Sequence, residues 1–392
     1  MGWKGFKKVN FYFQFCEKRS VPGCYAEIHS SRNTEAIKSD KTDGDFDPQV
    51  GTYVVEMFPS YFNFQVNDKF QRDFKKIFRV KGYCITLDQY DNVDQYLGAH
   101  FKPNFRTSMR RRLKGLESCF DVSYKMYYGQ IVKDDYDVIM DGLHQMLIRR
   151  FDQRNDKNVS LARWQEYYDN TFALINAHKA SLFVIYAGSK PIQISLSYHH
   201  DNMMFLSIPS YDIDYAKFGL GNISVQKLLE WCFANSYEML DMGFGAFDYK
   251  VKWCNEIYDF EHHLFYDRSS IISRGLVLLI RLKTRLINFL LAKKVNIYYH
   301  RIKAIFQGEK KSDQLEYQVQ KIDFDITALK DSQNSVNPMI DGSYAFLRKS
   351  VFDFLYTHRE HIKNIQVYEL ERNKVYVVKG VKQAQKIIYG NN

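Results

Sequence analysis

The sequence lacks the usual marks of secretion and of disulfide or thiol-redox chemistry. Its six cysteines are scattered and form no Cys-x-x-Cys pair, which predicts reduced thiols rather than a disulfide framework. Three lysines fall within the first eight residues and interrupt any apolar leader. We therefore expect a cytoplasmic protein.

The sequence also has no uninterrupted apolar run long enough to cross a membrane. The best candidate, 271–291, carries Arg274, Arg281, Lys283 and Arg285. A charge at the bilayer centre costs about 2.5 kcal/mol or more, even on the lenient insertion scale. We therefore interpret this segment as an amphipathic helix and not as a membrane-spanning one.

Several catalytic signatures are missing as well. The sequence contains no Gly-x-Ser-x-Gly, no phosphate-loop lysine motif and no kinase set. Two histidine pairs invite a metal reading: His199-His200 at the end of an expected strand and His262-His263 on another. Adjacent side chains on a strand point to opposite faces. No third ligand follows at a suitable spacing, so we expect no metal.

What the sequence does have indicates a folded protein of two or three domains. Aromatic residues make up 16% of the 392 residues, which argues against disorder. The formal net charge of +10 indicates an anionic partner, but it does not distinguish nucleic acid, a membrane face or a phosphorylated cofactor.

Hydrophobic periodicity and turn residues predict an alternation of strands and helices. We expect strands at 52–57, 62–66, 83–87, 122–128, 182–186, 192–198, 203–208, 239–242 and 258–266. We expect helices at 68–78, 92–117 with a break at Pro103, 134–150, 160–178, 222–236, near Tyr249, and 344–358. Residues 30–51 and 310–337 are polar and are predicted to be a loop and a linker, and a hairpin is expected at 365–378.

One stretch predicts phosphate binding. A glycine-bearing turn leads directly into the helix that begins near Asn222, and such a turn exposes backbone amides at the positive end of the helix dipole. The stretch consists of Tyr211, Asp212, Ile213, Asp214, Tyr215, Ala216, Lys217, Phe218, Gly219, Leu220, Gly221 and Asn222.

An arginine cluster offers a second anion site. Arg106 and Arg110 lie one helical turn apart, with Arg111 and Arg112 to either side. The cluster is either a solvated basic face or a clamp for a phosphate or carboxylate, which arginine binds bidentately.

These residues together resemble a known family. The element order, Tyr211-Asp212, the turn 215–221, Asp241 and the run Tyr249-Lys250-Val251-Lys252-Trp253 are similar to the GNAT acyltransferase superfamily, and in particular to its CelD-like branch related to FemAB peptidyltransferases. The resemblance covers about 106–266. It departs at Gly219-Leu220, where the branch usually has Ser-Pro.

The resemblance implies an α/β (α+β) fold, with a mixed, mostly antiparallel and splayed sheet flanked by helices. It also implies two tandem GNAT-like domains and a small C-terminal appendage. We expect a degenerate first domain at 1–120, the acyltransferase domain at 121–270, a basic amphipathic segment at 271–310, and a linker with a helix and hairpin at 311–392.

The resemblance further assigns roles. Ser207 and Ile208 would polarise the carbonyl with backbone amides, and Lys217 to Asn222 would hold an acyl-CoA, the expected co-substrate. The implied catalytic residues are Tyr249, Lys250, Asp241 and Asp248, and the implied substrate-binding residues are Arg106, Arg110, Tyr211, Asp212 and Trp253. Two structural alternatives stay open: Tyr249 as a packing residue, and Asp241 as a cap that orients the loop 243–246.

The function expected is transfer of an acetyl or other acyl group from acyl-CoA to an amine of a sugar, a metabolite or a cell-envelope precursor. Two alternatives are a FemAB-like aminoacyl transferase that uses aminoacyl-tRNA, and a catalytically inactive, membrane-associated binding or scaffold protein. The basic stretch 274–303 is either a helix packed on the core or a peripheral contact with an anionic membrane, which would give access to a lipid-linked acceptor.

Overall fold

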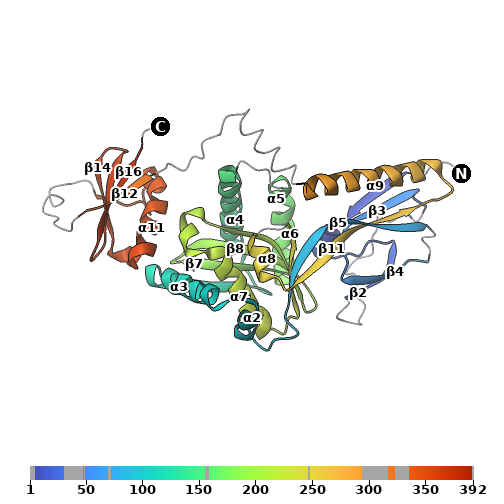
Figure 1. Cartoon of the computed structure of the whole chain (residues 1–392), viewed down its shortest axis with the longest axis horizontal. Coiled ribbons are helices and arrows are strands. Elements are labelled where there is room, and N and C mark those ends of the chain that lie inside the picture. Colours follow the sequence, from blue (N-terminus) through green and yellow to red (C-terminus); the bar gives the residue numbers. More distant parts are fainter. Residues whose placement is uncertain are drawn as a thin grey trace. The chain divides into compact units, whose positions relative to one another are not determined.

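A computed structural model describes residues 5–30, 47, 49–68, 72–154, 159–245, 248–293, 317–322 and 335–390. The chain forms two compact units (Figure 1). Unit 1 comprises residues 1–91, 198–207 and 232–309, and unit 2 comprises 92–197, 208–231 and 310–392. Both units are discontinuous in sequence, unlike the contiguous domains expected above, whose boundaries stay predictions.

Unit 1 is built on strands with one long helix. Its elements are β1 (Phe6–Asn10), α1 (Phe11–Cys16), β2 (Tyr25–Ser30), β3 (Thr52–Pro59), β4 (Phe62–Val66), β5 (Asp73–Thr86), β10 (Met239–Phe244), α8 (Asp248–Trp253), β11 (Glu256–Tyr266) and α9 (Ile271–Ala292). The strand order is β1-β3-β11-β5-β10, and β2 pairs with β4 in a separate hairpin. Part of its core is aromatic, since Phe11 packs against Phe15, Phe58 and Phe62.

Unit 2 holds most of the helices and a second sheet. Its elements are α2 (Val93–His100), α3 (Pro103–Cys119), β6 (Val122–Tyr127), α4 (Lys133–Arg154), α5 (Val159–Ala162), α6 (Trp164–Asn176), β7 (Ala180–Ala187), η1 (Ile213–Phe218), α7 (Leu220–Ala234), β12 (Tyr317–Lys321), β13 (Ser335–Val336), η3 (Gly342–Leu347), α11 (Arg348–His358), η4 (Ile362–Asn364), β14 (Gln366–Glu371), β15 (Val375–Lys379) and β16 (Ala384–Tyr389). Strands β8 (Lys190–His200) and β9 (Met203–Tyr211), and the end of α7, have residues in both units.

The predicted fold class is confirmed. The main sheet has nine strands in the order β1-β3-β11-β5-β10-β9-β8-β7-β6, and β1–β3 and β9–β10 are parallel pairs in it. Helices flank this mixed, mostly antiparallel sheet. The break at Pro103 is also confirmed, because proline occupies the first turn of α3, where its missing amide hydrogen is not needed.

Two secondary-structure predictions were wrong. Residues predicted as a helix at 68–78 include the start of β5, which pairs with β11 from Asp73 to Cys84. The helical spacing of its apolar residues was overruled by this long-range pairing. The predicted linker contains β12, which pairs with β16 at one edge of the five-stranded sheet β12-β16-β15-β14-β13. Most of the polar stretch 30–51 lies outside the described residues.

Across the residues that the structure describes, no helix is both long enough and apolar enough to span a membrane.

Candidate functional site

The predicted phosphate loop is a 3₁₀ helix followed at once by α7. Asp212 caps η1, because its side chain accepts a hydrogen bond from the amide of Asp214 at 3.1 Å. The chain then turns at Gly219, whose φ of +71° is unfavourable for any residue with a side chain. A Cβ there would lie 2.6 Å from Nη1 of Arg112. Glycine is therefore required both for the turn and for the approach of this arginine.

The loop keeps some of the amides that the sequence led us to expect. The carbonyl of Gly219 accepts hydrogen bonds from the amides of Asn222, at 3.0 Å, and Ile223, at 3.3 Å. The first two amides of α7, those of Leu220 and Gly221, make no hydrogen bond to any residue that the structure describes. The backbone amides of Leu220 and Gly221 thus remain as donors for an anion, whereas the amide of Asn222 already donates to the carbonyl of Gly219.

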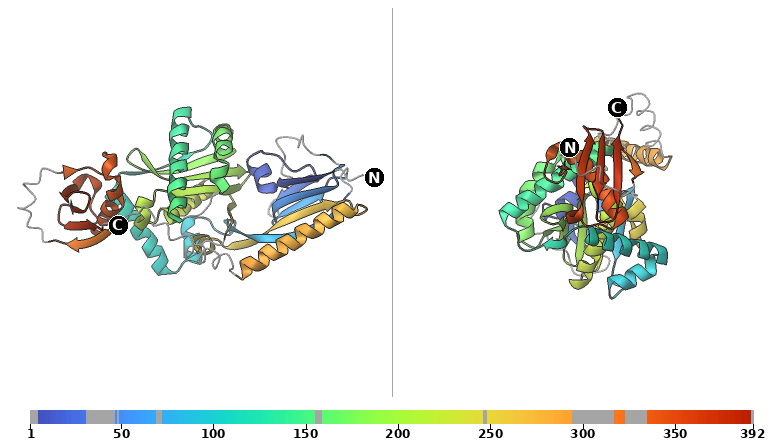
Figure 2. Two further views of the ribbon diagram at one scale, coloured as in Figure 1. Left: turned by 90° about the horizontal axis from the view of Figure 1, so that it is seen from above. Right: turned by 90° about the vertical axis from the view of Figure 1, so that its left-hand side faces the viewer.

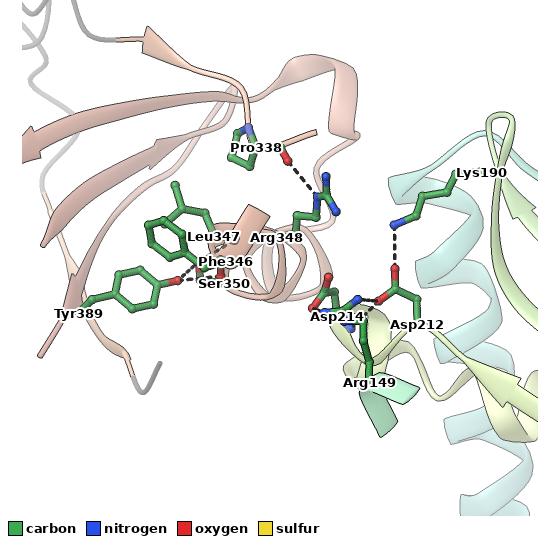
Figure 3. Close-up of polar contacts among 10 residues, drawn as sticks. All are labelled: Arg149, Lys190, Asp212, Asp214, Pro338, Phe346, Leu347, Arg348, Ser350 and Tyr389. Atoms are coloured by element: carbon green, nitrogen blue, oxygen red, sulfur yellow. Dashed lines mark hydrogen bonds and ion pairs between the residues drawn. The ribbon is translucent and has the colours of Figure 1, made fainter. Parts of the chain in front are cut away.

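A charge cluster of two buried carboxylates and two exposed cations fixes the start of this loop (Figure 3). Arg149 reaches from α4 to the Oδ1 atoms of Asp212 and Asp214, at 2.8 and 2.9 Å, and Lys190 donates to Oδ2 of Asp212 at 2.7 Å. Burial alone would raise the pKa of Asp212, but Lys190 and Arg149 hold it below the usual value. Asp212 is consequently a poor proton acceptor and a good anchor.

Asp214 differs from its neighbour in this cluster. Burial and the adjacent charge of Asp212 raise its pKa, although Arg149 opposes both. Its Oδ2 is buried and has no hydrogen-bond partner among the described residues. Asp214, which we had not assigned a role, is therefore the carboxylate of the pair that takes up a proton more readily.

Helix α11 from the C-terminal part of unit 2 packs against η1. Phe218 is fully buried, with its ring 5.2 Å from that of Tyr356 and 5.5 Å from that of Phe120. Lys217 forms an ion pair with Asp353 at 3.2 Å. Of the predicted cofactor-binding residues, Phe218 is thus a core residue, and the ammonium of Lys217 has a carboxylate partner within the protein.

The arginine helix α3 contributes a different residue from the pair we predicted. Arg110 is exposed, whereas Arg106 and Arg112 are half-buried and each has a buried Nε without a hydrogen-bond partner in the described part of the chain. The guanidinium of Arg112 lies against the glycine turn. We had predicted Arg106 and Arg110 as the ligand-binding pair, because one helical turn separates them.

Strand β9 separates from its neighbour β10 before the strand ends. It pairs with β10 through three residue pairs, the last being Phe205 with Asp241, yet it continues to Tyr211. Ser207 and Ile208 follow the last paired residue on this edge. Tyr211 ends the strand and lies beneath the guanidinium of Arg150, which is 4.9 Å from its ring centre.

A row of buried polar side chains runs along β8 below α7. Gln193 Nε2 donates to Ser195 Oγ at 2.7 Å, and Ser195 lies 3.2 Å from the hydroxyl of Ser224 on α7. Three more oxygens, Gln193 Oε1, Ser197 Oγ and Ser210 Oγ, are buried with no partner in the described residues. Unsatisfied buried groups are costly and commonly mark a place for water or a ligand.

In unit 1, Asp241 lies at the centre of a buried hydrogen-bond network. Its Oδ2 accepts from the hydroxyls of Tyr61 at 2.6 Å and Tyr258 at 2.7 Å, and its Oδ1 accepts from the amide of Gly243 at 2.5 Å. Burial raises the pKa of Asp241, although these hydrogen bonds oppose the shift. The ring of Tyr258 fits only because residue 82 is glycine, since a Cβ there would lie 2.3 Å from Cζ.

Lys250 is the other buried charge of unit 1. Its ammonium donates to the carbonyls of Met242 and Phe244, at 3.0 Å for the latter, and so closes the turn after β10. Burial lowers its pKa, while the charge of Asp241 opposes this effect. Asp241 and Lys250 both make hydrogen bonds to the backbone of the turn after β10, which fits the loop-orienting role that we had left open for Asp241.

The neighbours of Lys250 on α8 differ in exposure. Trp253 is fully buried and packs in the core, Asp248 is exposed, and Tyr249 is half-buried. Ala246 and Phe247 lie outside the described residues. The catalytic roles of Tyr249 and Asp248, and the substrate-binding role of Trp253, stay predictions.

The histidine pairs are held by structural contacts. His199 lies 2.8 Å from the hydroxyl of Tyr237, and His200 lies 2.9 Å from the carbonyl of Phe15. His263 contacts the hydroxyl of Tyr25 at 2.7 Å. Within the described ranges, no group of three or more His, Cys, Asp or Glu residues could hold a metal ion.

Comparison with known proteins gives one family match. Residues 103–251 match the model of the acetyltransferase (GNAT) domain, the superfamily whose resemblance the motifs indicated. This match begins at the first residue of α3 and ends within α8. No curated protein sequence matches the chain.

Solved structures give remote likenesses only. FemX is 10% identical, with 59% of this chain and 75% of that chain covered and a TM-score of 0.42. L-PGS from Bacillus licheniformis is 13% identical, with 60% and 72% covered and a TM-score of 0.39. A conserved protein of unknown function from Bacteroides thetaiotaomicron is 9% identical, with 56% and 71% covered and a TM-score of 0.38.

Proposed function

Because residues 103–251 match the model of the acetyltransferase (GNAT) domain, we propose that the protein transfers an acyl group from an acyl-CoA to an amine. The acceptor would be an amine of a sugar, a small metabolite or a cell-envelope precursor. The observation that carries the proposal is the pair of unpartnered amides, Leu220 and Gly221, with Arg112 beside the glycine turn that precedes them. Two amides at a helix N-terminus and a guanidinium suit a diphosphate.

The reaction needs a held donor, a polarised carbonyl and a proton for the leaving group. The amine nitrogen would attack the thioester carbon and lose a proton, the carbon–sulfur bond would break, and the thiolate would take up a proton, which gives an amide and free CoA. Backbone amides near Ser207 and Ile208 would stabilise the oxyanion, and Tyr249 would protonate the thiolate. Lys250 would keep the turn after β10 in place through its two carbonyl contacts.

Calorimetry with acetyl-CoA tests the donor site. We expect binding to the wild-type chain and a loss of at least tenfold in affinity for Gly221→Glu, which places a negative charge at the helix N-terminus. Gly342→Glu is the matched control, because it adds the same charge on η3, where a Cβ meets nothing within 4 Å. Absent binding, or equal binding by wild type and Gly221→Glu, would overturn the proposal. Binding without turnover on any amine would favour the inactive binding protein.

A FemAB-like use of aminoacyl-tRNA is the second candidate. It is supported by the net charge of +10 and by Arg110 and Arg111, which are exposed on α3. This candidate predicts tRNA binding that weakens steeply with salt, because phosphate contacts release counterions. Replacing Arg110 and Arg111 by alanine would reduce the salt dependence by about two ions if both contact phosphate.

A further inference from the structure

Helix α9 turns its polar side toward the protein. Its buried residues are Ser273, Val277 and Thr284, which recur on one face of the helix. Ser273 donates to the carbonyl of Gly51 at 3.1 Å, and Asn288 donates to that of Phe78 at 3.0 Å. Figure 2 shows this gold helix lying along blue strands of unit 1. Val277 and Ile280 join an apolar core cluster beneath it, with Val54, Leu264 and Tyr266.

The apolar side of α9 consequently faces outward. The helix carries nine of the 21 large apolar side chains that are exposed among the described residues. They are Ile271, Ile272, Leu278, Leu279, Leu282, Leu286, Phe289, Leu290 and Leu291. Leu279 and Leu286, seven residues apart, lie on the side opposite the buried stripe. An amphipathic helix normally buries this face, so its exposure requires an explanation.

Basic residues border the apolar face. Arg274, Arg281 and Arg285 share one flank of the helix, Lys283 lies on the other flank, and 271–292 contains no acidic residue. The helix therefore combines an outward apolar stripe with cationic edges. This arrangement is typical of helices that lie in the plane of a membrane interface.

A basic cavity of about 520 Å³ adjoins the same helix. Four of its lining residues are cations, Lys75, Arg268, Arg274 and Arg281, and one is an acid, Asp73. None of the four cations forms an ion pair with a carboxylate in the part of the chain that the structure describes. Unneutralised guanidinium groups that converge on one cavity suit a phosphate group.

The exposed apolar face and the basic residues of α9 together indicate which kind of partner would bind there. Nucleic acid would use the cations but would leave nine apolar side chains in water, and a neutral protein surface would leave the cations without counter-charge. An anionic bilayer satisfies both, because acyl chains take up the leucines and headgroup phosphates neutralise the arginines. We propose that α9 lies in the interface of an anionic phospholipid membrane, with a headgroup phosphate in the cavity beside Arg274 and Arg281.

Co-sedimentation of the full chain with vesicles tests this surface. We expect binding to vesicles of equal parts phosphatidylglycerol and phosphatidylcholine, and at least tenfold weaker binding to phosphatidylcholine alone. Raising the salt from 50 to 500 mM should weaken binding to the anionic vesicles, since the cationic contribution is screened. Equal binding to both vesicle types, or none to either, would overturn the proposal.

Two pairs of variants separate the local surface from net charge. Arg274→Glu with Arg281→Glu should weaken vesicle binding about tenfold or more, whereas Lys102→Glu with Lys114→Glu, which changes the net charge equally on α3, should leave it within about twofold. Leu279→Gln with Leu286→Gln should also weaken it about tenfold, against the exposed control Val132→Gln with Val138→Gln. Equal effects of a pair and its control would overturn the assignment to α9.

This inference does not depend on the proposed transferase activity. Thermal unfolding reports that the α9 variants are folded, whether or not the chain binds acetyl-CoA. If it does, its acetyl-CoA affinity, measured by calorimetry, should be unchanged in these variants. Salt-sensitive binding of tRNA that the Arg274 and Arg281 variants abolish, together with no vesicle binding, would replace the membrane by nucleic acid as the partner.

Discussion

Asp212 lies just beyond the end of β9 and Asp241 lies within β10, and although both are buried, their pKa values are shifted in opposite directions. Asp212 faces two cations, Arg149 and Lys190, and its pKa is held low. Asp241 receives three neutral donors, and its pKa is raised because burial outweighs them. A carboxylate paired with cations stays ionised, whereas one surrounded by hydroxyls is biased toward the neutral form. The chemical identity of the residue therefore says little about its role without its partners.

The largest effect should come from removing the carboxylate of Asp241. Asp241→Ala leaves the hydroxyls of Tyr61 and Tyr258 without an acceptor and Lys250 without a nearby counter-charge, so we expect the free energy of unfolding to fall by about 3 kcal/mol. Urea unfolding followed by tryptophan fluorescence measures it. Tyr61→Phe, which removes one hydrogen bond of the same network, should cost only about 1 kcal/mol. A loss for Asp241→Ala below that of Tyr61→Phe would contradict the network.

Removing a cation from the other cluster should have a smaller effect. Arg149→Ala leaves Asp212 and Asp214 facing each other, but the arginine side chain is 44% exposed, so solvent screens part of the loss. We expect destabilisation by about 2 kcal/mol, less than for a fully buried pair. Arg150→Ala, at the next position, should cost less than about 1 kcal/mol. Equal costs for the two variants would show that the buried pair is not what Arg149 stabilises.

The pH dependence should have opposite signs at the two carboxylates. Because its folded pKa is lowered, Asp212 contributes stability above the unfolded value of about 3.9, and this contribution is lost as the pH falls toward the folded pKa. The folded pKa of Asp241 is raised, so its contribution declines as the pH rises from about 3.9 toward the folded pKa. As the pH rises, the stability of Asp241→Asn should therefore increase relative to that of the wild type, and the stability of Asp212→Asn should decrease relative to it. Urea midpoints from pH 2 to 6 that move the same way for both variants, relative to the wild type, would refute the contrast.

The smallest effect is expected at Lys217. Its ion pair with Asp353 joins η1 to α11, but its side chain is 48% exposed, and exposed pairs contribute about 0 to 1 kcal/mol. Lys217→Ala should shift the unfolding midpoint by less than Arg149→Ala does. If Lys217 instead holds a donor diphosphate, the variant will lose acetyl-CoA affinity while keeping its stability, which calorimetry and thermal unfolding distinguish.

Much of the fold could be predicted because local signals and pairing agree over 92–266. Lys190 could also have been found, since a tight turn at 200–203 places Ile192 opposite Tyr211, next to Asp212, and the amide of Asp212 does donate to the carbonyl of Ile192. The partners of Asp241 could not, because Tyr61 precedes it by 180 residues and carries no local signal. The helix predicted at 68–78 failed for the same reason: its pairing with β11 is encoded far away.

The packing of α11 on η1 has a practical consequence for anyone who wishes to work with a shorter protein. Residues 103–251, the stretch that the family model matches, should not fold as an isolated fragment. An excised fragment with those bounds would strip the cover from Phe218 and Phe120, and it would leave β10 without its neighbour β5. Such a fragment should be insoluble, and cloning should retain both the early strands and the last sixty residues or so.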